Sequence, residues 1–293
     1  MFVRRAAVIV MIVGLSVLPG VGGIMGASQP DVYLSSKTIP QGAMGIIRVK
    51  VHEGNGPQVT WMKKMVNLAP NQKKTEWYGF IAADLRAKPG NYSIRVTFMP
   101  SSGTKKIPVK ITKKDYGERR LTLPKNMVDL DADTLKRVRK ESGKMKALWK
   151  ALPSDPLWRG PFLRPIPGAV VGPFGRKSFI NDQPRSPHTG VDLRGKRGTP
   201  IKAMNHGKVV LTGDHFFTGL TVVIDHGGGI QSMFFHLDKI MVNQGQTVSK
   251  GQVIGLVGST GRATGPHLHL GVRVNGARVD PLLLTEISRE LEE

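Results

Sequence analysis

The sequence contains no cysteine, which excludes disulfide bonds, thiol nucleophiles, thiolate zinc sites and a lipid-modified N-terminal cysteine. Acidic residues are also scarce, because 21 Asp and Glu stand against 43 Lys and Arg and leave a formal net charge of +22. The composition is 40% hydrophobic and 22% charged, with 35 Gly and 20 Pro. These values are typical of a globular, turn-rich, mostly β protein rather than a disordered or coiled-coil one.

The N-terminus has the pattern of a signal peptide. Two arginines precede an apolar run over residues 6–18, and small residues follow it. This run is shorter than the ~20 residues that cross a bilayer. We therefore expect residues 1–27 to direct export to the periplasm, the cell envelope or the extracellular medium. The alternative is an uncleaved signal that anchors the protein in the membrane, because residues 25–27 form a poor cleavage site.

The positive charge is spread unevenly along the chain. Residues 28–152 carry 25 Lys and Arg against 10 Asp and Glu, whereas residues 153–282 carry 15 against 7. In an exported protein such a field attracts anionic wall polymers or membrane headgroups, although a basic surface can also serve solubility alone. Nucleic acid is not expected as a partner, because no recognition helix or aromatic RNA-binding motif accompanies the charge. The sequence leaves the oligomeric state open.

The first domain is expected to be a β-sandwich over residues 28–116. Its strands are short, alternate in polarity and lie between turn residues at spacings of about 8 to 12 residues. The segment 88–92 resembles the strand start of immunoglobulin-like domains in cell-envelope proteins, so an immunoglobulin-like sandwich is expected. The clearest strands are 45–51, 77–81, 89–97 and 106–112.

A linker with an amphipathic helix is expected over residues 117–159. Apolar side chains recur at steps of three and four between residues 130 and 152, and Asp131 or Asp133 can cap the start. The basic face of this helix is interpreted as the solvated side of a helix packed between two domains, with binding of anionic polymer as the alternative. Prolines then mark the start of a second domain over 160–284, and 285–293 is expected as a short acidic tail.

The second domain reads as a series of β segments that contains most of the histidines. Three glycines, Gly227 to Gly229, tolerate the positive φ of a hairpin loop, so their flanking strands are expected to be antiparallel neighbours. Seven of the eight histidines follow residue 187. His267 and His269 alternate with leucines, and the period of two on a strand sends both imidazoles to one face.

A pair of imidazoles and one carboxylate is a donor set for zinc. Three such ligands leave the fourth tetrahedral position for water, which is the arrangement of catalytic rather than structural zinc sites. The clustering of histidine with aspartate in this half of the chain therefore points to a metal-dependent hydrolase.

Several further motifs stand in a fixed order over residues 165–283. They are Phe174-Gly175-Arg176, His188-x-Gly190-x-Asp192, Gly198-Thr-Pro-Ile201, Asp225-His226-Gly227, Phe235-His236-Leu237, the glycine-rich 251–261 and Thr264-Gly-Pro-His-Leu-His269. This series resembles the lysostaphin-like, or LytM-type, zinc metallopeptidases of peptidase family M23. The resemblance implies an antiparallel β-sheet domain with an open groove, one zinc ion, and hydrolysis of peptidoglycan stem or cross-bridge peptides in cell-wall remodelling.

The resemblance also assigns roles by position. His188, Asp192 and His269 match the family's zinc ligands, and His236 and His267 match its two histidines beside the metal-bound water. Zinc lowers the pKa of such a water to about 7 and polarises the scissile carbonyl. The two further histidines can deprotonate that water, stabilise the oxyanion and protonate the leaving amine.

One position departs from the family pattern. Where the family often has tyrosine two places before the histidine, this chain has Phe234, and no tyrosine follows Tyr116. This chain therefore has no tyrosine hydroxyl at that position.

The remaining candidates have plainer interpretations. Arg176 is expected to line the cleft and attract substrate carboxylates, with an ordinary surface arginine as the alternative, and Asn181 is expected to border the cleft as a substrate-binding residue. His206 and His215 are expected as exposed polar residues in turns, and His226 as a hydrogen-bonding residue that shapes a hairpin.

Two other functions compete with the endopeptidase. One is a catalytically weak or inactive LytM-type regulator that activates a separate wall amidase, although regulators of this kind have usually lost zinc ligands that this chain keeps. The other is a binding module in which the basic sandwich adheres to wall or membrane. Neither alternative needs all three ligand positions and both accessory histidines, whereas the endopeptidase does.

Overall fold

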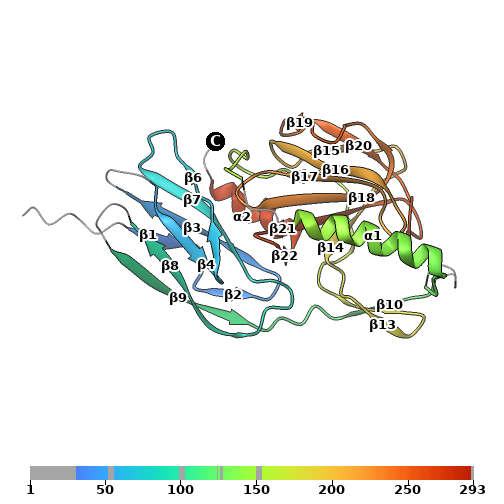
Figure 1. The fold of residues 1–293 in the computed structure, drawn as a ribbon, viewed down its shortest axis with the longest axis horizontal. Coiled ribbons are helices and arrows are strands. Elements are labelled where there is room, and N and C mark those ends of the chain that lie inside the picture. Colours follow the sequence, from blue (N-terminus) through green and yellow to red (C-terminus); the bar gives the residue numbers. More distant parts are fainter. Residues whose placement is uncertain are drawn as a thin grey trace, which may run out of the picture.

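The computed structural model describes residues 31–51, 56–98, 103–123, 125, 128–149 and 154–291. The expected signal peptide, residues 1–27, lies outside them. Two β-rich lobes lie side by side, and a long helix crosses one face of the second lobe (Figure 1). The mostly β class is confirmed. Among the described residues, no helix combines the length and apolar character that a membrane span requires.

The first lobe is a sandwich of two sheets. The side chains between the sheets come from both, and residues such as Ile47, Ile81, Ile94 and Ile111 are at most 1% exposed. The immunoglobulin-like type of this sandwich stays a prediction. One sheet has the order β1 (Val32–Leu34), β3 (Met44–Lys50), β7 (Glu76–Ala82) and β6 (Ala69–Pro70). The other has the order β2 (Thr38–Pro40), β9 (Thr104–Thr112), β8 (Gly90–Thr97), β4 (Gln58–Trp61) and β5 (Lys64–Val66).

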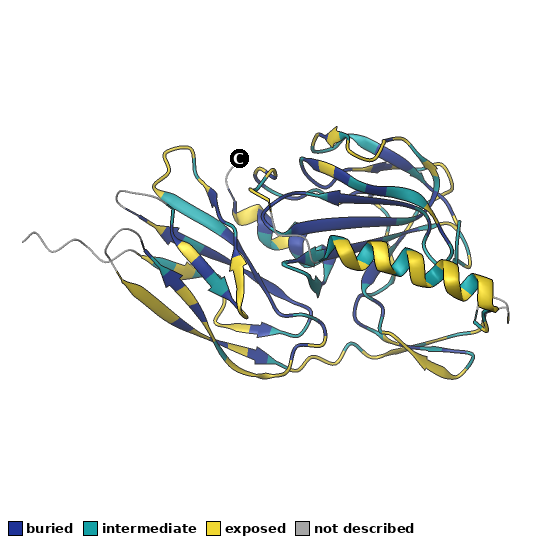
Figure 2. Cartoon of the chain, in the orientation of Figure 1, coloured by how far each residue is buried: buried dark blue, intermediate teal, exposed yellow. Residues whose placement is uncertain are grey.

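Strand β9 shows how the sequence selects this arrangement. Ile107, Val109 and Ile111 are buried, whereas the alternate residues Pro108 and Lys110 are exposed. Because successive strand side chains point to opposite faces, this alternation places one face of β9 in the core and a lysine-bearing face in solvent. The same separation of buried and exposed faces is visible in Figure 2.

The second lobe is built on a ten-stranded sheet. Its named pairings are all antiparallel, and Gly227 to Gly229 join two neighbouring strands with positive φ angles, as expected. A Cβ at Gly227 would stand 2.0 Å from the carbonyl oxygen of Asp155, so only glycine fits there. The main order is β11 (Val170–Gly172), β14 (Gly190–Arg194), β21 (His267–Val274), β18 (Ile230–Ile240), β17 (Gly219–Asp225), β16 (Gly207–His215) and β19 (Thr247–Val248). Three strands attach to this path: β15 (Pro200–Lys202), β20 (Val253–Val257) and β22 (Ala277–Val279).

A small third sheet joins the linker to the second lobe. Strand β10 (Glu118–Leu121) comes from the linker and pairs in parallel with β12 (Lys177–Ile180). Strand β12 in turn pairs with β13 (Gln183–Arg185) in antiparallel fashion. The segment just after the sandwich is therefore part of the structure that surrounds the cleft described below.

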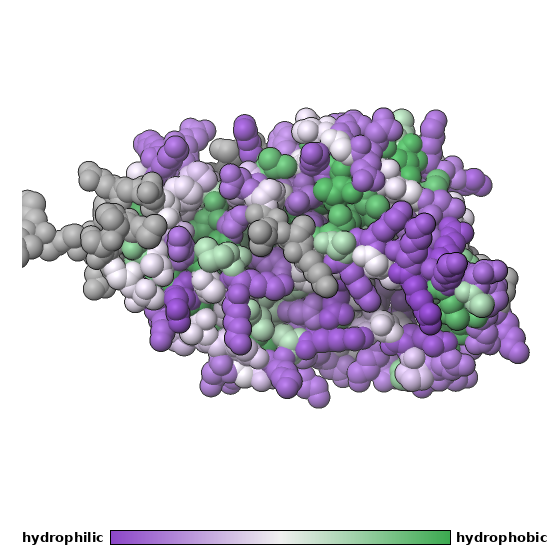
Figure 3. Space-filling view, in the orientation of Figure 1, coloured by the Kyte–Doolittle hydropathy of each residue, from purple (hydrophilic) through white to green (hydrophobic). Residues whose placement is uncertain are grey.

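Helix α1 (Ala132–Leu148) begins after Asp131, whose carboxylate accepts a hydrogen bond from the backbone N–H of Thr134 at 2.7 Å. Met145, Leu148 and Trp149 pack against a cluster on the sheet of the second lobe. The helix thus lies on the second lobe. The sequence had suggested a position between the two domains instead. Its outer face is exposed, and the surface over it is largely hydrophilic (Figures 2 and 3).

The two lobes share a hydrophobic cluster. Trp158 is 3% exposed and contacts Phe80 of the sandwich, with ring centroids 5.5 Å apart. Arg278 of the second lobe pairs with Asp84 of the sandwich, the Nε to Oδ2 distance being 2.9 Å. Near the C-terminus, α2 (Pro281–Ile287) and η2 (Ser288–Glu290) pack on the lobes and bury Leu284 and Leu291. The described part of the expected tail is therefore folded.

Candidate metal centre

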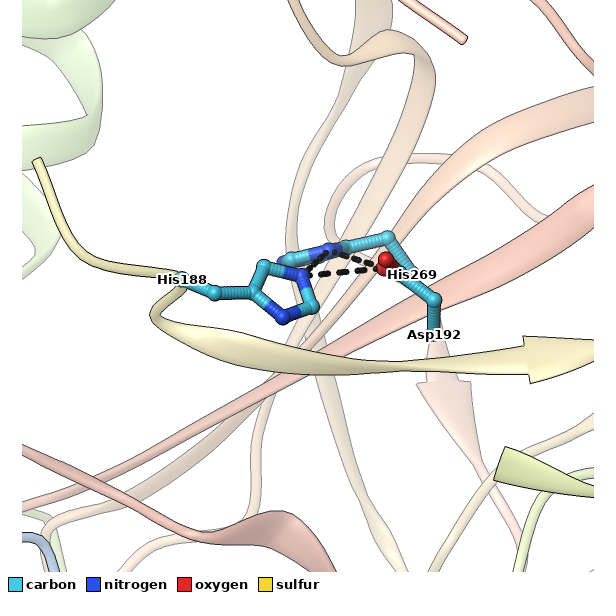
Figure 4. A group of neighbouring side chains, drawn as sticks. All are labelled: His188, Asp192 and His269. Carbon is cyan, nitrogen blue, oxygen red and sulfur yellow. Dashed lines mark hydrogen bonds and ion pairs between the residues drawn. The ribbon is translucent and has the colours of Figure 1, made fainter. Parts of the chain in front are cut away.

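Three expected ligands come together at two neighbouring strands of the large sheet. Strands β14 and β21 are antiparallel neighbours, and their register places Asp192 directly opposite His269. His188 lies two residues before β14, and its ring turns toward the other two (Figure 4). Nε2 of His188 is 3.0 Å from Oδ1 of Asp192, and Nδ1 of His269 is 2.8 Å from the same oxygen. All three donor atoms lie within 4.8 Å of one another.

The donor set and its surroundings fit a divalent metal such as zinc. The Nδ1–H of His188 donates to the backbone carbonyl of Pro173 at 2.8 Å, which fixes the ring and directs Nε2 at the group. Such an outer hydrogen bond is the usual device that orients a metal-binding imidazole. Two imidazole nitrogens and one carboxylate oxygen, close enough to share an ion, match the three protein ligands of a catalytic zinc site.

The charge states in this group also suit metal binding. Burial acts to raise the pKa of Asp192, but hydrogen bonds from His188 and His269 outweigh it and hold this pKa well below its usual range. Burial lowers the pKa of His269, so its ring is neutral near pH 7. A carboxylate and neutral imidazoles are the forms that coordinate metal.

Two further histidines border the same group. The rings of His236 and His267 lie 4.9 Å apart, and each is fixed through Nδ1, by the carbonyl of Thr260 and of Gly265 respectively, both at 2.8 Å. Burial first, and then the nearby His269, lowers the pKa of His236 to about 3. With Nδ1 occupied in both rings, the two Nε2 atoms are the ones available for chemistry in the cleft.

The backbone of His236 is itself unusual. Its φ is 65°, a left-handed conformation that non-glycine residues rarely adopt, and the pairing of β18 with β17 shifts register beside it. Its N–H donates to the carbonyl of Thr218 at 2.8 Å. A bulge of this kind redirects a side chain relative to the regular alternation of the strand.

The phenylalanines before His236 face opposite sides. Phe235 stacks on the ring of His269, with centroids 5.2 Å apart and planes at 3°. Phe234 has no exposed surface and belongs to the core of the lobe. At the position where the resemblance led us to look for a tyrosine, the side chain therefore packs in the core.

A cleft of about 700 Å³ runs over the group. Besides four of the histidines, its walls include four arginines, namely Arg119, Arg176, Arg194 and Arg262. Arg119 comes from strand β10 of the linker, and its Nη1 lies 3.7 Å from Oδ2 of Asp192. Of these arginines the sequence reasoning had identified only Arg176, because nothing local in the sequence shows that the linker pairs with β12.

The other candidates fall outside the cleft. The side-chain amide of Asn181 makes two hydrogen bonds with the backbone of Leu123, so its part is to hold the linker, and a substrate-binding role has no support. His226 is fully buried and hydrogen-bonded to the His206 carbonyl and to Ser232, which confirms it as a hydrogen-bonding residue. The prediction for His215 was wrong, because that side chain is only 7% exposed and lies in the pocket beneath α1.

Comparisons with known proteins converge on one family. Residues 186–281 match the model described as peptidase family M23. The peptidoglycan DD-endopeptidase ShyA of Vibrio cholerae is 46% identical over 97 residues, which are 33% of this chain and 23% of ShyA. The DD-carboxypeptidase/endopeptidase Mpg of Neisseria meningitidis is 41% identical over 124 residues, 42% of this chain and 29% of Mpg. The match thus spans less than a third of these relatives.

A solved structure matches over both lobes. The crystal structure of a putative peptidase M23 from Pseudomonas aeruginosa superposes with a TM-score of 0.62 at 34% sequence identity. The match covers 84% of this chain and 95% of that one. The similarity therefore includes the sandwich and the linker as well as the lobe that holds the histidines.

Proposed function

Because the chain belongs to peptidase family M23, we propose that it is a zinc-dependent endopeptidase that hydrolyses peptide bonds in peptidoglycan stem or cross-bridge peptides. The observation that carries this proposal is the convergence of His188, Asp192 and His269 in an open cleft, with two further imidazoles beside them. ShyA, the relative named as a peptidoglycan DD-endopeptidase, supports the substrate class. An amidase-activating regulator is not favoured, because every position that hydrolysis needs is kept.

In this proposal His188, Asp192 and His269 hold the zinc ion. When bound, zinc supplies Lewis acidity, which makes water a better nucleophile near neutral pH and polarises the scissile carbonyl. The chain's own contribution is to fix the three donors before the ion arrives: Pro173 orients His188, and Phe235 stacks on His269.

His236 and His267 carry the proton transfers. One Nε2 accepts the proton of the attacking water, whose oxygen forms the new bond to the carbonyl carbon. The Nε2–H formed by this transfer can then donate a hydrogen bond to the oxygen that gains negative charge. When the C–N bond breaks, the accepted proton passes to the leaving amine, so that one water is added across the peptide bond and no other reactant is consumed.

The cellular setting belongs to the same proposal. A substrate in the cell wall requires export, in agreement with the signal-peptide pattern of residues 1–27. The excess of basic residues upstream of the metal centre then faces an envelope rich in anionic polymer or lipid headgroups.

The test combines products, metal content and matched variants. Purified protein is incubated with defined sacculi, and the released muropeptides are identified by mass spectrometry. We expect cleaved peptide bonds with the wild type, about one zinc per chain, and loss of both zinc and turnover in His188→Ala and His269→Ala. His206→Ala, a histidine outside the cleft, should keep both. Full turnover in His188→Ala, or intact peptides with a zinc-loaded wild type, would overturn the proposal.

A further inference from the structure

The cleft over the metal centre carries an unbalanced positive charge. Among its described lining residues, four are arginines and one is a carboxylate, Asp192. Oδ1 of Asp192 lies within hydrogen-bond distance of ring nitrogens of His188 and His269, and its Oδ2 lies 3.7 Å from Nη1 of Arg119. One carboxylate that is shared in this way leaves the side chains of the cleft with a net positive charge.

Arg262 is the clearest case. Its guanidinium lies over the ring of Phe217, 4.1 Å from the centroid, and its backbone N–H donates to the Phe217 carbonyl at 2.9 Å. The side chain is partly buried, yet among the described residues it has no hydrogen bond or ion pair. Stacking on an aromatic ring holds the guanidinium plane while its N–H edges stay free to bind a planar anion.

Arg119 lies in the same cleft and on a different element. Its Nε donates to the hydroxyl of Ser178 at 2.8 Å, which fixes the guanidinium against β12. Arg262 and Arg119 both line this cleft. Burial first, and then the positive charges of Arg185 and Arg119, lowers the pKa of Arg262. Two fixed guanidinium groups in one cleft form a site for an anion.

We propose that Arg262 and Arg119 form a carboxylate-binding subsite, and that the cleft takes peptides with a free carboxylate beside the scissile bond. The proposal rests on the proposed function and narrows its substrate: acidic stem peptides are accepted, whereas neutral cross-bridges are not. A partly buried guanidinium without a counter-ion is unfavourable, so the binding of a carboxylate relieves a cost already present in the free protein. The planar fork of arginine matches a carboxylate through two parallel hydrogen bonds.

The test uses two crosslinked stem peptides that differ at one group, a free carboxylate or its carboxamide next to the scissile bond. We expect the wild type to cleave the acid with a kcat/KM roughly tenfold or more above that of the amide, as the loss of a charged hydrogen bond predicts. Arg262→Gln and Arg119→Gln should each lower the ratio of kcat/KM for the acid to kcat/KM for the amide. Arg262→Lys keeps the charge but not the fork, so it should restore only part of the preference.

The control is Arg159→Gln, which removes the same charge from an exposed position outside the cleft. It should keep the full preference for the acid. Equal kcat/KM for acid and amide in the wild type would overturn the subsite while leaving the endopeptidase intact.

If neither peptide is cleaved, the proposed function fails, and the affinities for the two peptides then test the subsite. Fluorescence anisotropy with labelled acid and amide peptides then gives the two affinities for each variant. Tighter binding of the acid that disappears in Arg262→Gln supports the subsite, whereas equal affinities overturn it.

Discussion

The side chain of Glu141 on helix α1 accepts a hydrogen bond from the backbone N–H of Phe216, with Oε2 2.9 Å from the nitrogen. Its other oxygen pairs with Arg137 at 2.7 Å. Phe216 begins a short loop whose Thr218 carbonyl accepts from the N–H of His236. A helix of the linker therefore supports the loop that holds one of the two accessory histidines.

Removal of this support should loosen the loop without unfolding the lobe. In Glu141→Ala the Phe216 N–H loses its partner, at a cost of about 1.5–3 kcal/mol for a hydrogen bond to a charged group. We expect faster amide hydrogen exchange in residues 214–219 by mass spectrometry, and a several-fold lower kcat. Glu141→Gln keeps an acceptor oxygen, so its exchange rate and its kcat should lie between those of the wild type and the alanine variant. Unchanged exchange in the alanine variant would show that α1 does not support the loop.

His226 makes the stability of the protein depend on pH. Burial lowers its pKa to about 4, below the usual value of 6.5, so the folded state keeps the ring neutral. The unfolded chain takes up a proton near pH 6.5 and therefore binds more protons below that pH. The contribution of the neutral His226 ring to the free energy of unfolding is complete above about pH 6.5. It is lost as the pH falls toward 4, and about 2 kcal/mol is lost by pH 5.

Urea denaturation at pH 7.5 and pH 5 measures this effect. His226→Gln should be less stable than the wild type at pH 7.5, because the pairing with Ser232 and the His206 carbonyl is disturbed. It should lose less stability between the two pH values. Because His236 and His269 also have a lowered pKa, the difference between variant and wild type isolates His226. Parallel losses in both proteins would contradict the assignment.

Part of the candidate metal group has a local signal in the sequence, whereas His188 and Asp192 were assigned by the resemblance to a known family. The alternation of His267 and His269 with leucines indicates a strand with both rings on one face, and β21 has this arrangement. A few neighbouring residues likewise indicate the hairpin at Gly227 to Gly229 and the helix cap at Asp131. The ordered motifs then identified the family.

Features that depend on distant pairing could not be predicted in this way. Arg119 reaches the cleft only because β10 pairs with β12, a contact between segments almost sixty residues apart. His215 is buried because α1 docks on the sheet, which the polar face of the helix does not reveal. The left-handed backbone of His236 accompanies the register shift between β17 and β18, and positive φ is too rare in non-glycine residues for the sequence to indicate it.

Charge on the sandwich should govern retention on the cell wall. Lys105, Lys106 and Lys110 are exposed on β9 and are not among the residues that line the cleft. The variant with all three changed to glutamine should bind purified sacculi more weakly than the wild type at low salt. The difference should vanish at high salt, since the Debye length falls from ~30 Å at ~0.01 M to ~3 Å at ~1 M.

Point substitutions suit this test better than deletion of residues 28–152. Such a deletion would remove β10, α1 and the sandwich side of the cluster around Trp158, and so disturb the second lobe as well. Lys202, Lys208 and Lys239 on the second lobe are exposed and provide a control triple with the same change in charge. Equal retention of the two triple variants would show that the sandwich has no special role in binding to the cell wall.

Phe234 should not tolerate the tyrosine that the family pattern suggests. The ring has no exposed surface and lies in the core, so a hydroxyl added there is buried without a hydrogen-bond partner. The cost is about 1–3 kcal/mol, which lowers Tm by several degrees in a chain of this size. Phe235→Tyr is the matched control, because that ring is partly exposed at the cleft wall and its hydroxyl can meet water. We expect Phe234→Tyr to lower Tm without raising kcat, and Phe235→Tyr to leave Tm nearly unchanged. A gain in kcat for Phe234→Tyr would mean that the side chain at this position can leave the core and reach the cleft.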